Sequence, residues 1–239
     1  MEITTRQGEI LNRIVQEYIN SAQPISSQLL EKKYDFDICP ASIRIEMQKL
    51  TDKGFLSQPH TSAGRIPTDK GYRFFVDRLF EKEFEEDEIS SDFEMDDWLE
   101  DEMQDTVKFI HILSRKAASV SQALVLNYLK NEKILWKEGW EEILKEPEFR
   151  KEENIIKLSD LLKDFEDDIE DLKINSGIQV FIGRENPLKK AKDFSIIISK
   201  YSLPHEGEGI ISFLGLKRMD YDRNISLLNS ITKIMESFN

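Results

Sequence analysis

The sequence predicts a protein of the α+β class, with a winged helix-turn-helix at the N-terminus followed by a second domain with an antiparallel sheet. Three observations lead to this prediction. Residues 4–80 show three helical patterns, two short apolar pairs and a fourth helical pattern, which is the order of elements in a winged helix. Residues 106–239 mix helical patterns with apolar runs bounded by turn residues, as α+β domains do. Residues 81–105, between these two parts, are strongly acidic.

The charge of the chain is unevenly distributed. The 239 residues carry a net charge of −13, which argues against a protein that coats nucleic acid generally. Residues 1–80 nevertheless hold 11 basic and 10 acidic side chains, whereas residues 81–239 hold 22 and 36. A nearly neutral first part can still bind DNA if its basic groups cluster on one face.

The single cysteine, Cys39, excludes an internal disulfide and fits a reducing compartment. The first residues, MEITTRQGEI, lack the basic and apolar regions of a signal peptide. No apolar run approaches the length of about 18 residues expected of a membrane span. We therefore expect a cytoplasmic protein that does not enter a membrane.

Residues 4–20 predict an amphipathic helix with Thr4 or Thr5 as its N-cap. Pro24 interrupts the chain, and Ser26 or Ser27 is expected to begin a second helix. Pro40 then opens a third helix.

The third helix is expected to have one buried and one exposed face. Ile43, Met47 and Leu50 recur at the spacing of a single helical face, and Gly54 is expected to end the helix in the left-handed conformation. The side chains that then face outward are Ser42, Arg44, Ile45 and Lys49.

The stretch QPHTSAGRIPTDKGYRFF, residues 58–75, predicts a wing and the helix that follows it. Residues 55–56 and 65–66 are the expected strands. The small side chains of the loop would let a DNA phosphate approach the main chain, and Arg65 adds positive charge. Gly64 is expected to allow the tight turn.

The acidic zone, residues 81–105, holds 14 acidic side chains and one lysine. Mutual repulsion favours an open, solvated and partly helical linker, with scattered apolar residues as anchors. An acidic arm that mimics DNA or shields the basic face is the alternative.

The domain after this zone is expected to contain an antiparallel sheet, because strand patterns follow one another with turn-like stretches between them. KRMDYDR, residues 217–223, is expected to join a strand to a helix, with Asp220 or Asp222 near the helix start and Arg218 or Arg223 in a salt link. The predicted helices are 107–122, 141–150, 153–172 and 221–238, and the predicted strands are 123–129, 133–140, 177–183, 193–201 and 208–216.

Several segments resemble the family of the heat-inducible transcription repressor HrcA. They are PISSQLL, CPASIRIEMQKLTDKGFLSQPHTSAGRIPTDKGYRFFVD, EPEFRKEENIIKLSDLL, IGREN and GLKRMDYDRNISLL. The block within residues 40–77 is the most specific, and the matches reach both ends of the chain.

The resemblance implies a fold and a function. HrcA proteins are bacterial dimeric repressors with an N-terminal winged helix, a GAF-like domain and a dimerising segment inserted in that domain. They bind an inverted-repeat operator upstream of chaperone genes, and the chaperonin GroEL keeps them active until heat stress draws it away. The expected domains are therefore a winged helix-turn-helix at 1–80, an acidic linker at 81–105 and a GAF-like domain at 106–239.

The chain departs from the family in two places. ALVLNYLKNEKILWKEGWEEIL, residues 123–144, passes almost directly from one expected strand to the next, so most of the inserted dimerising segment is missing. The family's third helix usually reads close to SPATIRNDM, whereas this chain has CPASIRIEM. Ile45 therefore stands where the family has an asparagine, which can read adenine, and offers only apolar contact, for example to a thymine methyl.

We expect Arg44 to contact a base or phosphate from the start of the third helix. Ser26 and Ser27 are placed to meet a phosphate or simply to cap a helix. The expected partner is a double-stranded inverted-repeat operator, bound by a homodimer. The full set of expected DNA contacts is Ser26, Ser27, Ser42, Arg44, Ile45, Lys49, His60, Thr61, Ser62, Gly64, Arg65 and Arg73.

No enzyme, metal site or cofactor is expected. His60 lacks a spaced partner, whereas zinc needs about four ligands, and the paired Asp220 and Asp222 lack an accompanying nucleophile. Cys39 is read as an unreactive thiol or as a redox switch. Two other functions stay open: a regulator whose GAF-like domain senses a small molecule, and an interaction protein that uses the acidic zone.

Overall fold

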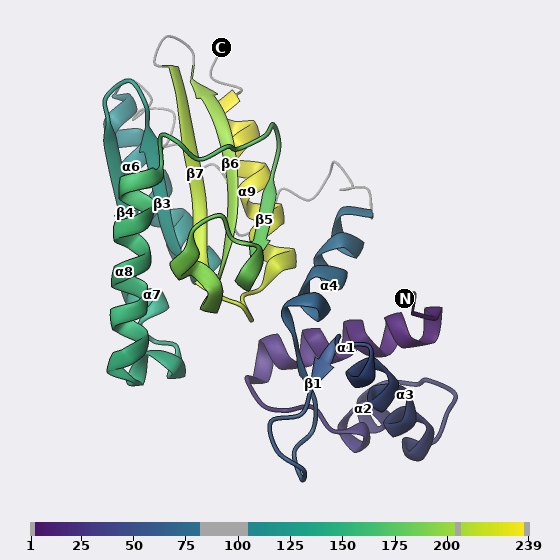
Figure 1. Ribbon diagram of the computed structural model, residues 1–239. Helices are drawn as coiled ribbons and strands as arrows, with labels where there is room; N and C mark the ends of the chain where they lie inside the picture. The colour runs from purple at the N-terminus through teal and green to yellow at the C-terminus, as the bar shows by residue number, and fades with distance from the viewer. Residues whose placement is uncertain (1–2, 82–104, 204–206, 237–239) are drawn as a thin grey trace. The chain divides into compact units, whose positions relative to one another are not determined.

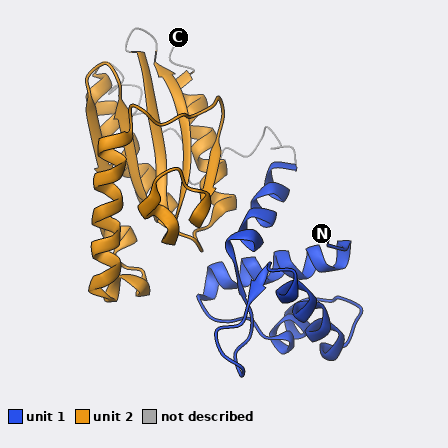
Figure 2. Cartoon of the chain, viewed as in Figure 1, with its two compact units in different colours: residues 1–83 blue, residues 84–239 orange. Residues whose placement is uncertain are grey.

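The computed structural model describes residues 3–81, 105–203 and 207–236. The chain divides into two compact units, Met1–Glu83 and Phe84–Asn239 (Figure 2). The acidic linker expected at residues 81–105 lies, except for its two end residues, outside the described residues. The two units are described separately below.

The described residues of unit 1, 3–81, form four helices and a two-stranded hairpin (Figure 1). A capping box starts the first helix, since the Thr4 side chain accepts from the Gln7 N–H and the Gln7 side chain accepts from the Thr4 N–H. The elements are α1 (Thr5–Ser21), α2 (Ser27–Lys33), α3 (Pro40–Asp52), β1 (Leu56–Ser57), β2 (Ile66–Pro67) and α4 (Asp69–Glu81).

Local signals set the ends of these helices. The Ser26 side chain accepts the Leu29 N–H at the start of α2, and Thr68 accepts the Gly71 N–H at the start of α4. Gly54 follows α3 with φ of 78°, as predicted. The helices enclose one apolar core, to which α1 gives Ile10, Leu11, Ile14 and Val15, α3 gives Ile43, Met47 and Leu50, and α4 gives Tyr72, Phe75 and Val76.

A polar network fixes α3 against α1. The Gln7 Nε2 donates to Glu46 Oε2 at 2.7 Å, and the Lys53 Nζ donates to Gln7 Oε1 at 2.9 Å. Lys49 Nζ also bonds to Glu46, at 2.7 Å. The bond from Lys49, with that from Gln7, lowers the pKa of Glu46. The orientation of α3 is therefore set by charge-assisted hydrogen bonds as well as by its buried face.

Unit 2 is a five-stranded antiparallel sheet with helices on both faces (Figure 1), which confirms the α+β class. The strand order is β4-β3-β7-β6-β5. Its elements are α6 (Thr106–Ser121), β3 (Leu124–Leu129), β4 (Ile134–Glu138), α7 (Trp140–Ile143), η2 (Pro147–Arg150), α8 (Glu152–Asp168), β5 (Gln179–Ile182), η3 (Gly183–Glu185), η4 (Lys189–Asp193), β6 (Phe194–Leu203), β7 (Gly207–Leu216) and α9 (Tyr221–Glu236).

The central strands are buried on both faces, which explains their continuous apolar runs. Leu126, Ile196 and Leu214 face a core formed with α8, while helices α6 and α9 contact the sheet through β3 and β6. One buried polar chain crosses between α6 and the sheet. Tyr201 donates to Asn127 at 2.6 Å, and Asn127 donates to Ser114 at 3.1 Å, so each group has a partner.

Two of the predicted helices in unit 2 are wrong in extent. Residues 141–150 do not form one helix, because Pro147 cannot continue α7 and instead begins the short helix η2. The helix predicted at 153–172 ends at Asp168. The other seven strands and helices predicted for this unit correspond to elements of the structure within a few residues.

The junction at residues 217–223 forms as expected. Asp220 Oδ1 accepts the Arg223 N–H near the start of α9, at 3.2 Å. Arg218 donates two hydrogen bonds of 2.8 Å to Glu148 and also bonds to Glu146, both near η2. Burial opposes ionisation of Glu148, but the bonds from Arg218 outweigh it and lower the pKa of this carboxyl group. The junction therefore has a structural role, because Arg218 connects the segment before α9 to the segment around η2.

Among the helices in the described parts of the chain, none is long and apolar enough to cross a membrane.

Candidate nucleic-acid interface

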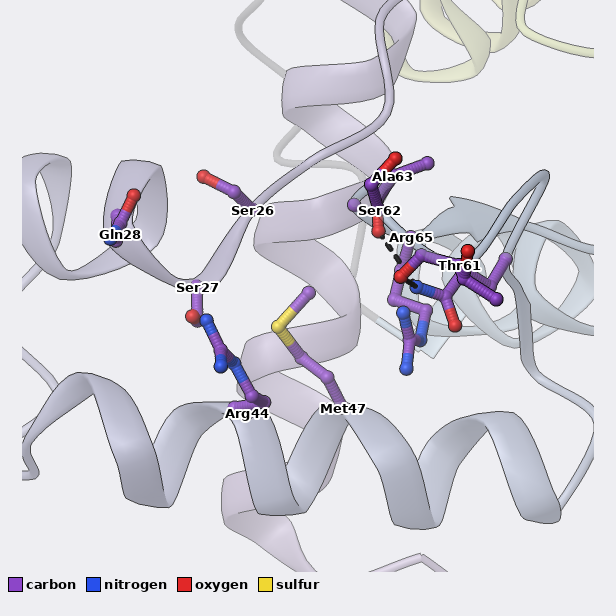
Figure 3. Close-up of a pocket in the computed structure, with 11 residues that line it drawn as sticks. Ser26, Ser27, Gln28, Arg44, Met47, Thr61, Ser62, Ala63 and Arg65 are labelled. Carbon is purple, nitrogen blue, oxygen red and sulfur yellow. Dashed lines mark hydrogen bonds between the residues drawn. The ribbon is translucent and has the colours of Figure 1, made fainter.

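An open pocket with a volume of about 540 Å³ lies in unit 1, where α2, α3 and the loop before β2 meet. Figure 3 shows its three sides: residues 26–28 at the start of α2, Arg44 and Met47 on α3, and Thr61, Ser62, Ala63 and Arg65 of the loop. Two arginines and no carboxylate line it, so we call it the arginine groove. Its residues are Ser26, Ser27, Gln28, Arg44, Met47, Gln58, Thr61, Ser62, Ala63, Gly64 and Arg65.

Arg44 is the arginine of the groove whose side chain has no hydrogen-bond partner among the described residues. It lies on the exposed face of α3, one turn from the helix start, and it makes no hydrogen bond or ion pair with any described residue. Ser26 is exposed on the α2 side and its oxygen caps α2, while Ser27 is buried. Because the Ser26 oxygen acts as an acceptor in the cap, its hydroxyl hydrogen can still be donated to a ligand.

Arg65 is held back against α3. Its Nε donates to Thr51 Oγ1 at 3.0 Å and its Nη2 donates to Gln48 Oε1 at 2.8 Å. Both partners are neutral, so the positive charge of the guanidinium is not compensated. An arginine has five N–H donors, so three of those on Arg65 have no partner among the described residues. We conclude that Arg65 joins the loop to α3 while keeping donors for a ligand.

The main chain anchors the loop at the same place. Ile25 and Arg65 exchange two backbone hydrogen bonds, of 2.9 and 2.8 Å, in an isolated bridge. A Cβ on Gly64 would lie 2.3 Å from the Ile25 oxygen. Gly64 does not have a positive φ, so close packing against Ile25, and not the tight turn that we expected, requires glycine here.

Gln58 organises the remainder of the loop. Its Nε2 donates to the carbonyl oxygens of Thr61 and Ala63, at 3.0 and 2.9 Å. His60 Nδ1 lies 3.2 Å from Ser62 Oγ. These contacts fold the loop back on itself, so that Thr61 and Ser62 line the groove and the exposed His60 does not.

The exposed face of α3 continues beyond the groove. Ile45 is 56% exposed, which makes it the most exposed of the large apolar side chains described. Lys49 is tied to Glu46, and Gln48 is bonded both to Arg65 and to Asp52, at 2.8 Å in each case.

Cys39 and Ser42 lie together at the start of α3. Cys39 is the N-cap residue, it is exposed, and its sulfur lies 3.4 Å from Ser42 Oγ. This contact is the main reason that the pKa of the Cys39 thiol is lowered. Ser42 is thus engaged locally and does not line the groove.

The structure brings together most but not all of the predicted residues. Arg73 lies on α4, where it is paired with Asp77 at 3.4 Å. The sequence analysis missed Gln28 and Gln58, although a glutamine before Pro59 and a glutamine at a helix start are both visible in the sequence. Of the predicted residues, Ser26, Ser27, Arg44, Thr61, Ser62, Gly64 and Arg65 line the groove, and Ser42, Ile45, Lys49, His60 and Arg73 do not.

The groove has the chemistry of a site for the backbone of a nucleic acid. Uncompensated guanidinium groups, hydroxyl groups and loop main chain are the donors that bind phosphate oxygens. A helix face next to such donors can reach base edges in the major groove.

Comparisons with known proteins identify relatives along the chain. Residues 72–225 match the family model described as the HrcA protein C-terminal domain. The chain is 30% identical to the heat-inducible transcription repressor HrcA of Natranaerobius thermophilus, over 97% of this chain and 95% of the relative. It is also 55% identical to the protein of the same name from Carboxydothermus hydrogenoformans, over 34% of this chain and 24% of the relative.

The match to the Natranaerobius protein extends over 330 positions, which exceeds the 239 residues of this chain by 91. The relative therefore contains residues that have no counterpart here. Among solved structures, a crystal structure described only as that of a hypothetical protein matches 99% of this chain and 98% of its own, with a TM-score of 0.80 and 23% identity. That likeness supports the fold alone.

Proposed function

The chain belongs to the HrcA family, and we propose that it is a heat-inducible transcription repressor that binds DNA through unit 1. Its relatives in Natranaerobius and Carboxydothermus are named as such repressors. The repressed genes are heat-shock genes, and the protein acts in the cytoplasm.

We propose that unit 1 is a winged helix-turn-helix, with α2 and α3 as the helix pair and residues 58–65 as the wing. The observation that carries this proposal is the arginine groove, because a unit with nearly equal numbers of acids and bases presents there two arginines and no carboxylate. In this arrangement α3 enters the major groove, and the wing contacts the DNA backbone. Unit 2 is proposed to be GAF-like.

The operator is proposed to be an inverted repeat bound by a homodimer. Two copies of unit 1 related by a two-fold axis match two half-sites in opposite orientation. Heat would release the repressor, with the chaperonin GroEL as the partner that keeps it active. This part of the proposal rests on family membership. A purified DNA-binding assay in which added GroEL has no effect on the affinity would contradict it.

Binding to DNA tests the core of the proposal. The full chain would be used to select duplexes from a randomised library, and affinity for a selected and a scrambled duplex would be measured at 50–200 mM salt. We expect Arg44→Ala to weaken binding of the selected duplex by at least about 30-fold, because a bidentate arginine–guanine contact is worth about 1–3 kcal/mol and the dimer loses one such contact in each half-site. Arg6→Ala is the matched control, since Arg6 is exposed on α1 and outside the groove.

Failure to select any duplex, even at 50 mM salt, would contradict the proposal. Equal loss in the two arginine variants would show that the groove has no special role.

Control by a small molecule is the second candidate. The cavity beneath α8, lined by residues that include Phe165, Phe181 and Ile198, has a volume of about 20 Å³, whereas ligand sites usually have about 300–1,000 Å³. A surface hollow of about 310 Å³ that includes Arg115, Glu138 and Trp140 is the better place for such a ligand. A thermal-shift screen that stabilised unit 2 without DNA would favour this candidate.

A further inference from the structure

The first two turns of α3 present an apolar surface next to a free cation. Ala41 and Ile45 are one turn apart on the exposed side, and Arg44 is exposed between them in sequence. Buried residues of the same helix, such as Ile43 and Met47, face the core. An exposed isoleucine alone would need no explanation, but here a second apolar residue lies next to it on the helix face proposed to enter DNA.

The polar side chains farther along this face are already engaged. Gln48 accepts from Arg65 and donates to Asp52, so its amide is fixed by two hydrogen bonds of 2.8 Å. Lys49 is bonded to Glu46 at 2.7 Å. A glutamine reads adenine with its amide oxygen and nitrogen together, and both of these atoms are occupied in Gln48. In the first three turns of α3, Arg44 is therefore the exposed polar side chain that keeps its donors available for a base edge.

We infer that α3 recognises a thymine through its 5-methyl group, with Ile45 and Ala41 as the contacting residues, beside a guanine bound by Arg44. The inference rests on the proposed function. The thymine methyl is the apolar group that base pairs expose in the major groove, and guanine O6 and N7 form the pair of acceptors that matches a guanidinium. Neighbouring positions on one helix reach neighbouring base pairs, so each half-site contains a thymine next to a guanine.

The size of the effect follows from the burial of one methyl group. Removing it costs about fourfold in affinity, which corresponds to about 0.8 kcal/mol for one buried CH₂-sized group. A dimer contacts one such methyl group in each of two half-sites, so removing both should lower the affinity by about 15-fold.

The test replaces thymine by deoxyuridine, which lacks only the methyl group. In a selected duplex, each thymine pair related by the two-fold symmetry would be replaced in turn, and binding would be measured with wild type, Ile45→Ala and Ile45→Val. We expect one position beside a guanine at which the wild type loses about 15-fold. Ile45→Ala should lose little further at that position, and Ile45→Val should keep most of the sensitivity.

Arg44→Ala is the contrasting variant, because it should lose discrimination at the guanine and keep its sensitivity to the methyl group. Selection of a duplex at which no thymine responds would overturn the inference and leave the proposed function standing. Equal sensitivity to deoxyuridine in wild type and Ile45→Ala would also overturn it. So would a change of solution mass in Ile45→Ala without any change in methyl sensitivity, since Ile45 would then contact protein. Failure to select any duplex would remove both proposals.

Discussion

Arg65→Ala separates two roles of one side chain, since Arg65 both connects the loop at residues 58–65 to α3 and carries charge into the arginine groove. In the structure its guanidinium bonds to Gln48 and Thr51, while its main chain pairs with Ile25. The substitution removes the two side-chain bonds and leaves the backbone bridge in place. We therefore expect unit 1 to stay folded, with a lower free energy of unfolding and a lower affinity for DNA.

The two effects have different sizes. Hydrogen bonds to a charged group contribute about 1.5–3 kcal/mol when buried, but Gln48 is exposed and Arg65 is half-buried. A total loss of about 1–2 kcal/mol in unfolding free energy is therefore expected. Loss of one phosphate contact in each of the two half-sites reduces the slope of log K against log salt by about 1.8. Between 50 and 200 mM salt, the ratio of wild-type to variant affinity should then shrink by about 12-fold.

The assay is binding of a selected and a scrambled duplex across that salt range, with wild type, Arg65→Ala and Arg65→Lys. Arg65→Ala should weaken both duplexes alike, because a phosphate contact carries no base information. Arg65→Lys should keep the wild-type salt slope but lose stability, because an ammonium group cannot span Gln48 and Thr51 with the geometry of a guanidinium.

An unchanged salt slope in Arg65→Ala would refute the phosphate role and leave Arg65 as a residue that only positions the loop at residues 58–65. An unchanged free energy of unfolding in Arg65→Ala would refute the idea that the Arg65 side chain stabilises the loop against α3.

Three further predictions concern stability. Gly64→Ala should break the bridge to Ile25, because the new Cβ would lie 2.3 Å from the Ile25 oxygen; a loss of about 2 kcal/mol is expected, with faster hydrogen exchange in the loop as the measurement. Glu46→Gln should lower the stability of unit 1 by about 1 kcal/mol at pH 7. Because the folded-state pKa of Glu46 is lowered, the wild-type advantage should be present above the ordinary glutamate pKa and should disappear as pH falls through the lowered folded-state pKa, which a urea series at several pH values would show. Arg218→Met should lower the stability of unit 2 by about 3 kcal/mol in denaturant unfolding followed by tryptophan fluorescence, and adding Glu148→Gln should restore part of the loss, since the unpaired carboxylate is then removed.

Much of the fold could be predicted from the sequence because its signals are local. The apolar spacing of Ile43, Met47 and Leu50 identified the buried face of α3, and all three are buried. Gly54 marked the end of that helix. The strands of unit 2 were readable because a sheet covered on both faces needs continuous apolar runs. The error at residues 141–150 arose although Pro147 was visible, because the acidic and apolar spacing on either side of it is also helical.

The arrangement of the arginine groove could be predicted only in part, because it depends on contacts between residues distant in sequence. Arg65 was identifiable as a basic wing residue, but its bonds to Gln48 and Thr51 cross 17 and 14 positions. The requirement for Gly64 comes from Ile25, 39 positions earlier. Neither partner has a pattern in the sequence that points to the other.

The acidity of the chain is compatible with DNA binding because screening limits which charges the DNA experiences. At 0.15 M salt the screening length is about 8 Å, so the two arginines of the groove would act on a phosphate bound there, while distant carboxylates would be largely screened. At 0.01 M salt this length is about 30 Å, and the net charge of −13 then repels the DNA as a whole. The rise in affinity on lowering salt should therefore flatten below about 20 mM. A variant with Asn and Gln in place of the acids of residues 81–105 should keep a straight plot to lower salt. Equal curvature in both chains would show that these acids are not the source of the repulsion.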